Sequence, residues 1–329
     1  MYTVGIDLGG TNIAIGICDE NLNIIDKASI PTDKSYGGEG IVAGMAALTK
    51  QLMKKCKIDI SQIEYVGMAL PGSIDAELGI IEYSNNLPFE NFQICDEFKK
   101  HLKVENIYIE NDANAAALAE ALRGVARGTR TSVMITLGTG VGGGVIIDGK
   151  IFKGGVNSAG AELGHTVIKA GGRLCTCGRR GCFEAYSSAT GLITSTVEMM
   201  KELEAKGIPS RLFEIAKRDG KVSAKTAFEA KSIGDEAGTK LVNEYISDLA
   251  VGITNMVNIF QPEVLSIGGG VSNAGNELLA PLSKIVEKEH YARNNSRQPR
   301  LAIATLKNDA GIIGAAGLGR QFYNGKKQR

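Results

Sequence analysis

The chain lacks an excess of charge of either sign. Its 329 residues include 37 basic and 36 acidic side chains, which gives a formal net charge of +1. Proteins that bind nucleic acid usually show a strong basic excess or a basic face. Here Lys and Arg form no long run apart from the short tail at residues 326–329. We therefore expect no nucleic-acid partner.

The sequence also lacks a long apolar run. No stretch approaches the roughly 18 to 20 apolar residues that cross a bilayer, and residues 1–7 show neither the basic segment nor the apolar segment of a signal peptide. We therefore expect a cytoplasmic protein with no membrane partner. Thiols stay reduced in that compartment, so the six cysteines need an explanation other than stable disulfides.

Glycine is abundant, and its distribution is informative. A chain of 329 residues is long for a single core, so two domains are expected. Many of the 42 glycines stand where apolar strands end, as at residues 9–10, 138–144 and 268–270. Glycine lets a ligand approach backbone N–H groups closely. This distribution predicts a main chain that wraps around a charged ligand.

Apolar periodicity predicts strands that alternate with helices, which is typical of an α/β protein. Strands are expected at 2–6, 13–17, 24–30, 65–69, 107–109, 132–137, 145–148, 264–267 and 301–306. Helices are expected at 40–56, 113–122, 189–206, 233–260, 277–289 and 309–323. The strand–turn–strand pattern near the start recurs at 132–148, which indicates a duplicated domain, although so short a match also fits chance.

A histidine and three cysteines form the clearest local motif. His165 is followed after nine residues by Cys175, Cys177 and Cys182. One imidazole and three thiolates are a complete tetrahedral ligand set for structural zinc, and Gly178 and Gly181 permit the tight chain reversal. Free thiols or a chance disulfide are the alternative. The motif predicts zinc that holds a loop with little apolar material of its own.

Two glycine turns follow strands in matching places. The first is Asp7-Leu-Gly-Gly-Thr-Asn12 and the second begins Leu137-Gly-Thr-Gly140. Backbone N–H groups and the Thr11 hydroxyl would bind phosphate oxygens, and Asp7 would hold Mg²⁺ directly or through water. Neither turn is a Walker loop, because no Gly-Lys-Ser/Thr follows. The alternative is a hairpin turn in which glycine serves geometry alone.

Polar residues elsewhere have two readings. Asn111 and Asp112 stand between a strand and a helix, where they would cap the helix or supply a carboxylate base for an attacking hydroxyl. Glu162, His165 and Glu184 flank the cysteine motif, and such side chains can discriminate sugar hydroxyls by hydrogen bonds. Solvated surface is the alternative for the two glutamates.

Together these motifs resemble the ROK family of repressors and sugar kinases, in particular its bacterial glucokinases, over nearly the whole chain. The motifs that carry the resemblance are those above together with Glu110-Asn-Asp-Ala-Asn-Ala-Ala116 and Ala161-Glu-Leu-Gly-His165. The resemblance implies an actin/hexokinase-like α/β fold of two duplicated ribonuclease-H-like domains with an interdomain cleft. We expect a small domain at 1–111 plus 309–329, and a large domain at 112–308 that contains the zinc loop at 165–184. The last helix is expected to pack on the small domain.

The resemblance also implies a reaction and its residues. It implies transfer of the γ-phosphate of ATP to a hexose, most often glucose, with Mg²⁺ and with Asp112 as catalytic base. The implied sugar contacts are Gly72, Asn86, Asn111, Asp112, Glu162, His165 and Glu184. The implied phosphate and nucleotide contacts are Asp7, Gly9, Gly10, Thr11, Asn12, Gly138, Thr139, Gly269 and Gly270. A homodimer or homotetramer is expected from the family.

Several alternatives remain open. N-acetylglucosamine, N-acetylmannosamine, mannose, allose or fructose could replace glucose as acceptor. A non-catalytic sugar-binding regulator would bind sugar without turnover, and an ATPase or chaperone of the actin superfamily would hydrolyse ATP whether or not sugar is present. A repressor is disfavoured, because the first phosphate strand begins at Tyr2 and we expect no DNA-binding domain before it.

Overall fold

The computed structural model describes residues 1–155 and 160–323. By internal contacts the chain divides into two compact units. The first unit comprises Met1–Ser132, Gly144–Ala161 and Thr305–Arg329, and the second comprises Val133–Gly143 and Glu162–Ala304. These compact units are not the same division as the domains expected from the family, 1–111 with 309–329 and 112–308, which stay a prediction.

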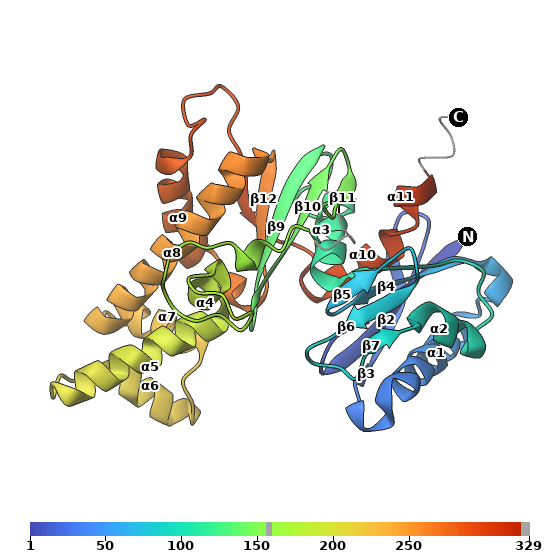
Figure 1. Ribbon diagram of the computed structural model, residues 1–329, viewed down its shortest axis with the longest axis horizontal. Coiled ribbons are helices and arrows are strands. Elements are labelled where there is room, and N and C mark those ends of the chain that lie inside the picture. Colours follow the sequence, from blue (N-terminus) through green and yellow to red (C-terminus); the bar gives the residue numbers. More distant parts are fainter. Residues whose placement is uncertain (156–159, 324–329) are drawn as a thin grey trace. The chain divides into compact units, whose positions relative to one another are not determined.

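The first unit is built on a five-stranded sheet with the order β3-β2-β1-β4-β8 (Figure 1). Its strands are β1 (Tyr2–Leu8), β2 (Asn12–Cys18), β3 (Ile24–Pro31), β4 (Ile63–Leu70) and β8 (Ile107–Asn111). The three N-terminal strands form an antiparallel meander, while β4 lies parallel to both β1 and β8. The strands expected in this part of the sequence are all present.

Helices cover both faces of this sheet. On one face α1 (Gly37–Cys56), with α2 (Ile94–His101) beside it, packs over a core that includes alternate residues of β1. On the other face lie α3 (Asp112–Leu122) and α10 (Ala310–Gly317). A Cβ at Gly5 or Gly67 would overlap the backbone of α10, so these two glycines let the helix rest directly on the sheet. The last helix therefore packs on the N-terminal part of the chain, as expected.

The first unit has further short elements. A small antiparallel sheet has the order β5-β6-β7. The bounds are β5 (Ser73–Asp75), β6 (Ile80–Tyr83), β7 (Glu90–Phe92), α11 (Arg320–Tyr323) and the 3₁₀ turns η1 (Lys34–Tyr36), η2 (Ile60–Gln62) and η5 (Lys307–Asp309).

A second five-stranded sheet has the order β11-β10-β9-β12-β13. Its strands are β9 (Thr131–Leu137), β10 (Val141–Ile147), β11 (Lys150–Phe152), β12 (Val264–Gly268) and β13 (Arg300–Ile303). Pairing is antiparallel between β10 and β11 and parallel between β12 and β13. Numbered along the chain, both sheets follow the order third, second, first, fourth, fifth. The repeated glycine turn therefore marks a repeated sheet plan.

Helices make up most of the second unit. They are α4 (Phe183–Ser187), α5 (Ala189–Ala205), α6 (Arg211–Asp219), α7 (Ala224–Ser232), α8 (Glu236–Phe260) and α9 (Asn276–Glu289), with 3₁₀ turns η3 (Leu163–His165) and η4 (Gly270–Ala274). The expected packed face of α8, at every fourth residue from Leu241 to Val257, is buried. Within the described ranges, no helix is both long enough and apolar enough to cross a bilayer.

The structure corrects several expected elements. The sequence did not indicate α2, α4, α6 or α7. The helix α8 begins at Glu236, three residues later than expected, because Asp235 caps it by accepting the Gly238 N–H at 2.7 Å. The strand expected to reach Leu306 ends at Ile303, since the N–H groups of Thr305 and Leu306 donate to the Glu120 carboxylate, each at 2.8 Å.

The final helix, expected to be continuous to Tyr323, is interrupted after Gly317. At this break the Tyr65 hydroxyl donates to the Ala316 carbonyl at 2.6 Å. A carbonyl of the last α10 turn is thereby satisfied by a side chain, and the helix need not continue.

Candidate active site and metal centre

The first glycine turn joins β1 to β2. It is closed by the Gly9 N–H, which donates to the Asn12 carbonyl at 2.9 Å. Thr32 supports it from β3's end, with its hydroxyl on the Gly9 carbonyl and its N–H on the Thr11 carbonyl, both at 2.8 Å. Thr11 and Asn12 are exposed. The predicted phosphate residues Gly9, Gly10, Thr11 and Asn12 thus form one supported turn, and Thr32 has no sequence signal that marks it.

Asp7 lies at the end of β1, where its carboxylate faces α10. A Cβ on Gly311 would collide with this carboxylate, so glycine is required there. Burial, together with the negative charge of Asp112, raises the pKa of Asp7 to about 6. The predicted Mg²⁺ residue and the predicted base therefore act on each other within the first unit. A bound cation would relieve the repulsion between two such carboxylates.

Asp112 lies at the junction where β8 ends and α3 begins. Asn111 is the N-cap of α3, and its side-chain oxygen accepts the N–H groups of Ala113 and Asn114 at 2.9 and 3.3 Å. Asp112 is the first helical residue and is exposed, with one carboxylate oxygen 2.8 Å from the Ala113 nitrogen. The helix N-terminus favours the charged carboxylate. Capping is thus mainly the work of Asn111, and Asp112 lies exposed in the first turn of the helix.

A buried ion pair between Glu110 and Lys153 supports the junction of β8 and α3. Glu110 is 5% exposed, and one of its oxygens accepts the Asn111 N–H at 3.0 Å and the Asn114 side-chain amide at 3.1 Å. Its other oxygen lies 2.6 Å from the Lys153 ammonium. The family motif includes Glu110 and Asn114, but sequence reasoning gave neither a role and missed Lys153.

Two further predicted sugar residues lie in the first unit. The Asn111 side-chain amide donates to the Gly72 carbonyl at 3.2 Å. Gly72 has φ of 102°, and a side chain there would collide with the Tyr83 carbonyl. Asn86 is exposed, and its Cβ lies 3.7 Å from the position that a Cβ on Gly10 would take. Gly72 therefore adjoins Asn111, and Asn86 adjoins the first glycine turn.

The second glycine turn joins β9 to β10. The Gly138 N–H donates to the Gly140 carbonyl at 3.0 Å. The start of α5 supports the turn, because the Ala189 N–H donates to the Gly138 carbonyl at 2.8 Å and the Thr190 hydroxyl donates to the Thr139 carbonyl at 2.7 Å. A threonine hydroxyl thus holds a carbonyl of each glycine turn, as Thr32 does in the first.

Glu184 lies between the second turn and the cysteine loop. One carboxylate oxygen accepts the Val141 N–H at 3.0 Å, and the other accepts the Thr176 hydroxyl at 3.1 Å. A Cβ on Gly140 would collide with this carboxylate. Glu184 is therefore not a solvated surface residue, and the structure joins it to two of the predicted motifs. Thr176 is a contact that sequence reasoning missed.

Glu162 and His165 flank the 3₁₀ turn η3. The His165 N–H donates to the Glu162 carbonyl at 3.1 Å, so the two residues share one tight turn. Glu162 is exposed and His165 half-buried.

The cysteine loop brings four ligand side chains together. The ligand atoms of His165, Cys175, Cys177 and Cys182 all lie within 4.8 Å of one another. The Cys177 and Cys182 sulfurs are 3.7 Å apart, as are the Cys175 sulfur and His165 Nδ1. Tetrahedral Zn–S bonds of about 2.3 Å would place sulfurs about 3.8 Å apart. The donor set and spacing therefore fit four-coordinate zinc.

Glycines shape this loop as the sequence predicts. Gly178 and Gly181 have φ of 84° and 85°, in the region that favours glycine. A side chain at Gly181 would also collide with the Lys169 carbonyl. Short antiparallel bridges pair Val167 with Cys182 and Leu174 with Arg180, so the loop is a tight hairpin.

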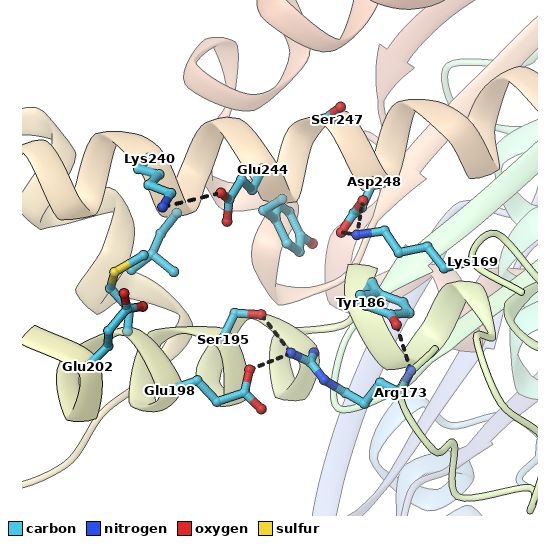
Figure 2. A pocket seen from close by; sticks show the side chains of 13 residues that line it. Lys169, Arg173, Tyr186, Ser195, Glu198, Glu202, Lys240, Glu244, Ser247 and Asp248 are labelled. Atoms are coloured by element: carbon cyan, nitrogen blue, oxygen red, sulfur yellow. Dashed lines mark hydrogen bonds and ion pairs between the residues drawn. The ribbon is translucent and has the colours of Figure 1, made fainter. Parts of the chain in front are cut away.

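The base of this loop adjoins a groove of about 500 Å³ between α5 and α8 (Figure 2). Lys169 pairs there with Asp248 at 2.7 Å, and Arg173 pairs with Glu198 at 2.8 Å. Both cations also lie over the ring of Tyr186. None of these residues was predicted, because the sequence does not distinguish a paired charged residue in a loop from one that is solvated at the surface.

A second cavity of the second unit, of about 400 Å³, adjoins the turn after β12. Gly270 lines it together with the apolar side chains of Phe228, Val271 and Ala274. Gly269, just before it, has φ of 81° and lies against the backbone of Leu137. The predicted nucleotide residues Gly269 and Gly270 therefore stand at the edge of a pocket with an apolar wall.

The repeated sheet plan, with helices on the sheets and a glycine turn in each, defines an actin/hexokinase-like α/β fold of the sugar-kinase type. A family model described as "ROK family" matches residues 3–321. The chain therefore belongs to the ROK family.

Similar proteins match over almost their full length. A glucokinase of Halalkalibacterium halodurans is 38% identical over 98% of this chain and 96% of its own. A ROK hexokinase of Thermus thermophilus has a TM-score of 0.81 at 30% identity, with 98% of this chain and 100% of that chain covered. A ROK glucokinase of Streptomyces griseus, solved with glucose and AMPPNP, has a TM-score of 0.78 at 30% identity, with the same coverage.

Proposed function

We propose that this protein is an ATP-dependent hexose kinase that phosphorylates glucose to glucose 6-phosphate. The observation that carries the proposal is the exposed Asp112 carboxylate at the N-terminus of α3, in a chain that is 38% identical to a glucokinase over 98% of its length. Phosphoryl transfer needs a residue that accepts the proton of the attacking hydroxyl, and Asp112 supplies it.

In this proposal the sugar contacts are the residues that the family resemblance implies. Asp112 accepts the proton of the sugar 6-hydroxyl. Asn111 caps α3 and donates its side-chain amide to the Gly72 carbonyl, and these bonds fix the backbone beside Asp112. The remaining contacts are Asn86, Glu162, His165 and Glu184. Carboxylates, amides and imidazole are suited to a ring of hydroxyls, because a site built around a hydroxyl rejects an analogue that lacks it.

The two glycine turns bind the phosphates of ATP. Their residues are Gly9, Gly10, Thr11, Asn12, Gly138 and Thr139. Mg²⁺, when bound with ATP, neutralises charge that develops on the phosphates, and Asp7 would hold it directly or through water. The apolar wall of Phe228, Val271 and Ala274 beside Gly269 and Gly270 suits the adenine ring.

His165, Cys175, Cys177 and Cys182 would hold a structural zinc ion. The tetrahedral spacing supports zinc, and four protein ligands leave no position for a reacting group. Reduced thiols at this centre fit a cytoplasmic location. We also propose that the protein assembles as a homodimer or homotetramer, as the family resemblance implies.

ADP release by the purified protein with Mg-ATP tests the reaction. The acceptors are glucose, mannose, fructose, allose, N-acetylglucosamine and N-acetylmannosamine, with a sugar-free control. We expect strong turnover with glucose. Preference for an acetylated sugar would keep the reaction and change the substrate, whereas ADP release that is the same without sugar would indicate a simple ATPase. Calorimetric sugar binding without turnover would indicate a regulator.

A further inference from the structure

The cysteine loop has a second attachment to the second unit, separate from its four metal ligands. This attachment consists of Lys169, Arg173 and Tyr186, at the base of the loop beside the groove between α5 and α8 (Figure 2). Lys169 and Arg173 come from the loop itself, and Tyr186 comes from α4, the five-residue helix that carries Glu184. The attachment therefore joins the loop to the helix of a predicted sugar contact.

Arg173 makes most of the contacts. Its guanidinium donates to the Ala185 carbonyl at 2.8 Å and to the Gly191 carbonyl at 3.4 Å. It also donates to the Ser195 hydroxyl at 3.2 Å and to the Glu198 carboxylate at 2.8 Å. One side chain thus reaches α4 and three positions along α5, at Gly191, Ser195 and Glu198. A planar guanidinium with five donors can make all of these contacts at once, whereas a lysine ammonium could make only some of them.

Tyr186 completes the attachment. Its hydroxyl accepts the backbone N–H of Arg173 at 2.6 Å, and a side chain on Gly172 would collide with this hydroxyl. The Lys169 ammonium and the Arg173 guanidinium lie 4.4 and 5.0 Å from the ring centroid, within range of cation–π attraction. Lys169 further pairs with Asp248 of α8. These side chains therefore link the loop to α4, α5 and α8 in addition to the backbone hydrogen bonds between them.

The charges of the groove are used within it. Arg173 is paired with Glu198, Lys169 with Asp248, and Lys240 lies 4.0 Å from Glu244 (Figure 2). Because each of these cations already has a carboxylate partner, the groove has no unpaired charge centre of its own to bind an ionic ligand. Its charged side chains are better explained as links between the loop and the helices than as a binding site for a ligand.

We propose that Arg173 is a positioning residue that fixes α4, and with it the Glu184 carboxylate, independently of the metal ion. The proposal rests on the proposed function, in which Glu184 contacts the sugar. Ala185, whose carbonyl Arg173 holds, is the next residue after Glu184. The zinc ligands hold the part of the loop around Thr176, whose hydroxyl donates to Glu184. Arg173 holds α4 through the Ala185 carbonyl.

The expected consequence is a loss of sugar affinity with metal content unchanged. Without Arg173, the Ala185 carbonyl of α4 loses its side-chain link to Ser195 and Glu198 of α5. We then expect the Glu184 carboxylate to shift relative to the Val141 N–H that it accepts. A contact equally strong in the ground and transition states affects KM and leaves kcat unchanged. We expect the KM for glucose to rise about tenfold, since a small misplacement of a positioned group has a large effect.

The test is Arg173→Met, which keeps the side-chain length and removes every side-chain donor, while the backbone N–H that Tyr186 accepts stays. Its controls are Arg180→Met, an exposed arginine of the same loop whose guanidinium makes one long contact to the Gly172 carbonyl at 3.4 Å, and Arg173→Lys, which keeps the charge and is expected to restore part of the affinity. For each variant we would measure zinc per chain, thermal unfolding, and the KM and kcat for glucose.

A raised KM with one zinc per chain and unchanged kcat supports the proposal, provided that Arg180→Met behaves like the unmodified protein. An unchanged KM in Arg173→Met overturns it, and so does zinc loss in parallel with the raised KM. Glu198→Gln removes a single exposed acceptor; if Arg173→Met does not fold, a two- to threefold rise in KM in this variant supports the proposal and an unchanged KM overturns it.

Glu184→Gln separates this proposal from the function on which it rests. If Glu184→Gln raises the KM for glucose and Arg173→Met does not, only the positioning role fails. If the unmodified protein phosphorylates no sugar, or Glu184→Gln leaves the KM unchanged, the proposed function or its residue assignment fails.

Discussion

Asp112 and Glu184 both stand at the start of a helix, but the structure holds them by different means. Asp112 begins an eleven-residue helix whose entry is fixed by the buried pair of Glu110 and Lys153, with side chains 6% and 23% exposed. Glu184 belongs to a helix of five residues. Its supports are the half-exposed Arg173 pair, with side chains 24% and 62% exposed, and the cysteine loop.

This difference determines how each region should fail. A buried ion pair that loses one partner leaves an uncompensated charge, which destabilises the fold. Exposed ties and metal ligands can be lost while the surrounding helices stay packed, so the damage stays local. We therefore expect substitutions around Asp112 to affect turnover or stability, and substitutions around Glu184 to affect sugar binding.

The largest expected effect is that of Asp112→Asn on turnover. Loss of the base should lower kcat by about 10²- to 10⁴-fold, the usual contribution of a positioned general base. Sugar affinity by calorimetry should change little, because the amide keeps the shape of the side chain. Near-normal kcat in this variant would remove Asp112 as the base.

Lys153→Met should destabilise the protein without touching a predicted substrate residue. It leaves the buried Glu110 carboxylate without its cation, at a cost of about 3–5 kcal/mol in the free energy of unfolding. Urea unfolding measures this loss. The double variant with Glu110→Gln should recover most of it, since the buried charge is then gone. The exposed pair of Arg130 and Asp148, with side chains 83% and 65% exposed, is the matched control, and Asp148→Asn should cost less than about 1 kcal/mol.

Asp7→Asn should stabilise the protein in a pH-dependent way. The pKa of Asp7 is raised from 3.8 to about 6 in the folded protein, so folding favours the protonated form. The penalty is absent below about pH 4, grows as pH rises towards 6, and is complete above it, at about 3 kcal/mol. Without Mg²⁺ and ATP, Asp7→Asn should therefore unfold at a higher urea concentration at pH 8 and at an unchanged one at pH 3.5. An equal effect at both pH values would show that the carboxylate charge is not the cause.

The sequence predicts what is local in this comparison. The cysteine spacing, the glycines at 178 and 181, and the strand–turn–strand repeat all follow from short stretches of chain, and the structure has each of them. The helix cap at Asn111 is also local, although spacing alone could not separate capping from catalysis.

What could not be predicted depends on residues far apart in sequence. Lys153 reaches Glu110 across 43 positions of sequence, and Arg173 reaches Glu198 across 25. Glu120 ends a strand 185 residues away by accepting the Thr305 N–H. No periodicity links such pairs, because only the folded backbone brings them together, and charged side chains in one sequence look alike whether they are solvated or paired.

Cys177→Ser should weaken sugar binding and leave the fold in place. Loss of one ligand should remove zinc and free the part of the loop where Thr176 meets Glu184. We expect the KM for glucose to rise about 10- to 100-fold, with zinc per chain measured by metal analysis. Full zinc content in this variant would exclude Cys177 as a ligand. Cys95→Ser, a cysteine of the first unit, should keep both zinc and affinity.

The smallest expected effect comes from Gly140→Ala, which tests the support of Glu184 from the second glycine turn. The added methyl would collide with the Glu184 carboxylate, whereas one at Gly138 would meet nothing within 4 Å. The carboxylate can swing aside, at the cost of about 0.5–1.5 kcal/mol for a strained side-chain angle, so the KM for glucose should rise about two- to fivefold with unfolding unchanged. Gly138→Ala, in the predicted phosphate turn, should instead raise the KM for ATP. Steady-state kinetics with each substrate varied in turn distinguishes the two variants. The same KM for glucose in both would show that displacing the Glu184 carboxylate does not affect sugar binding.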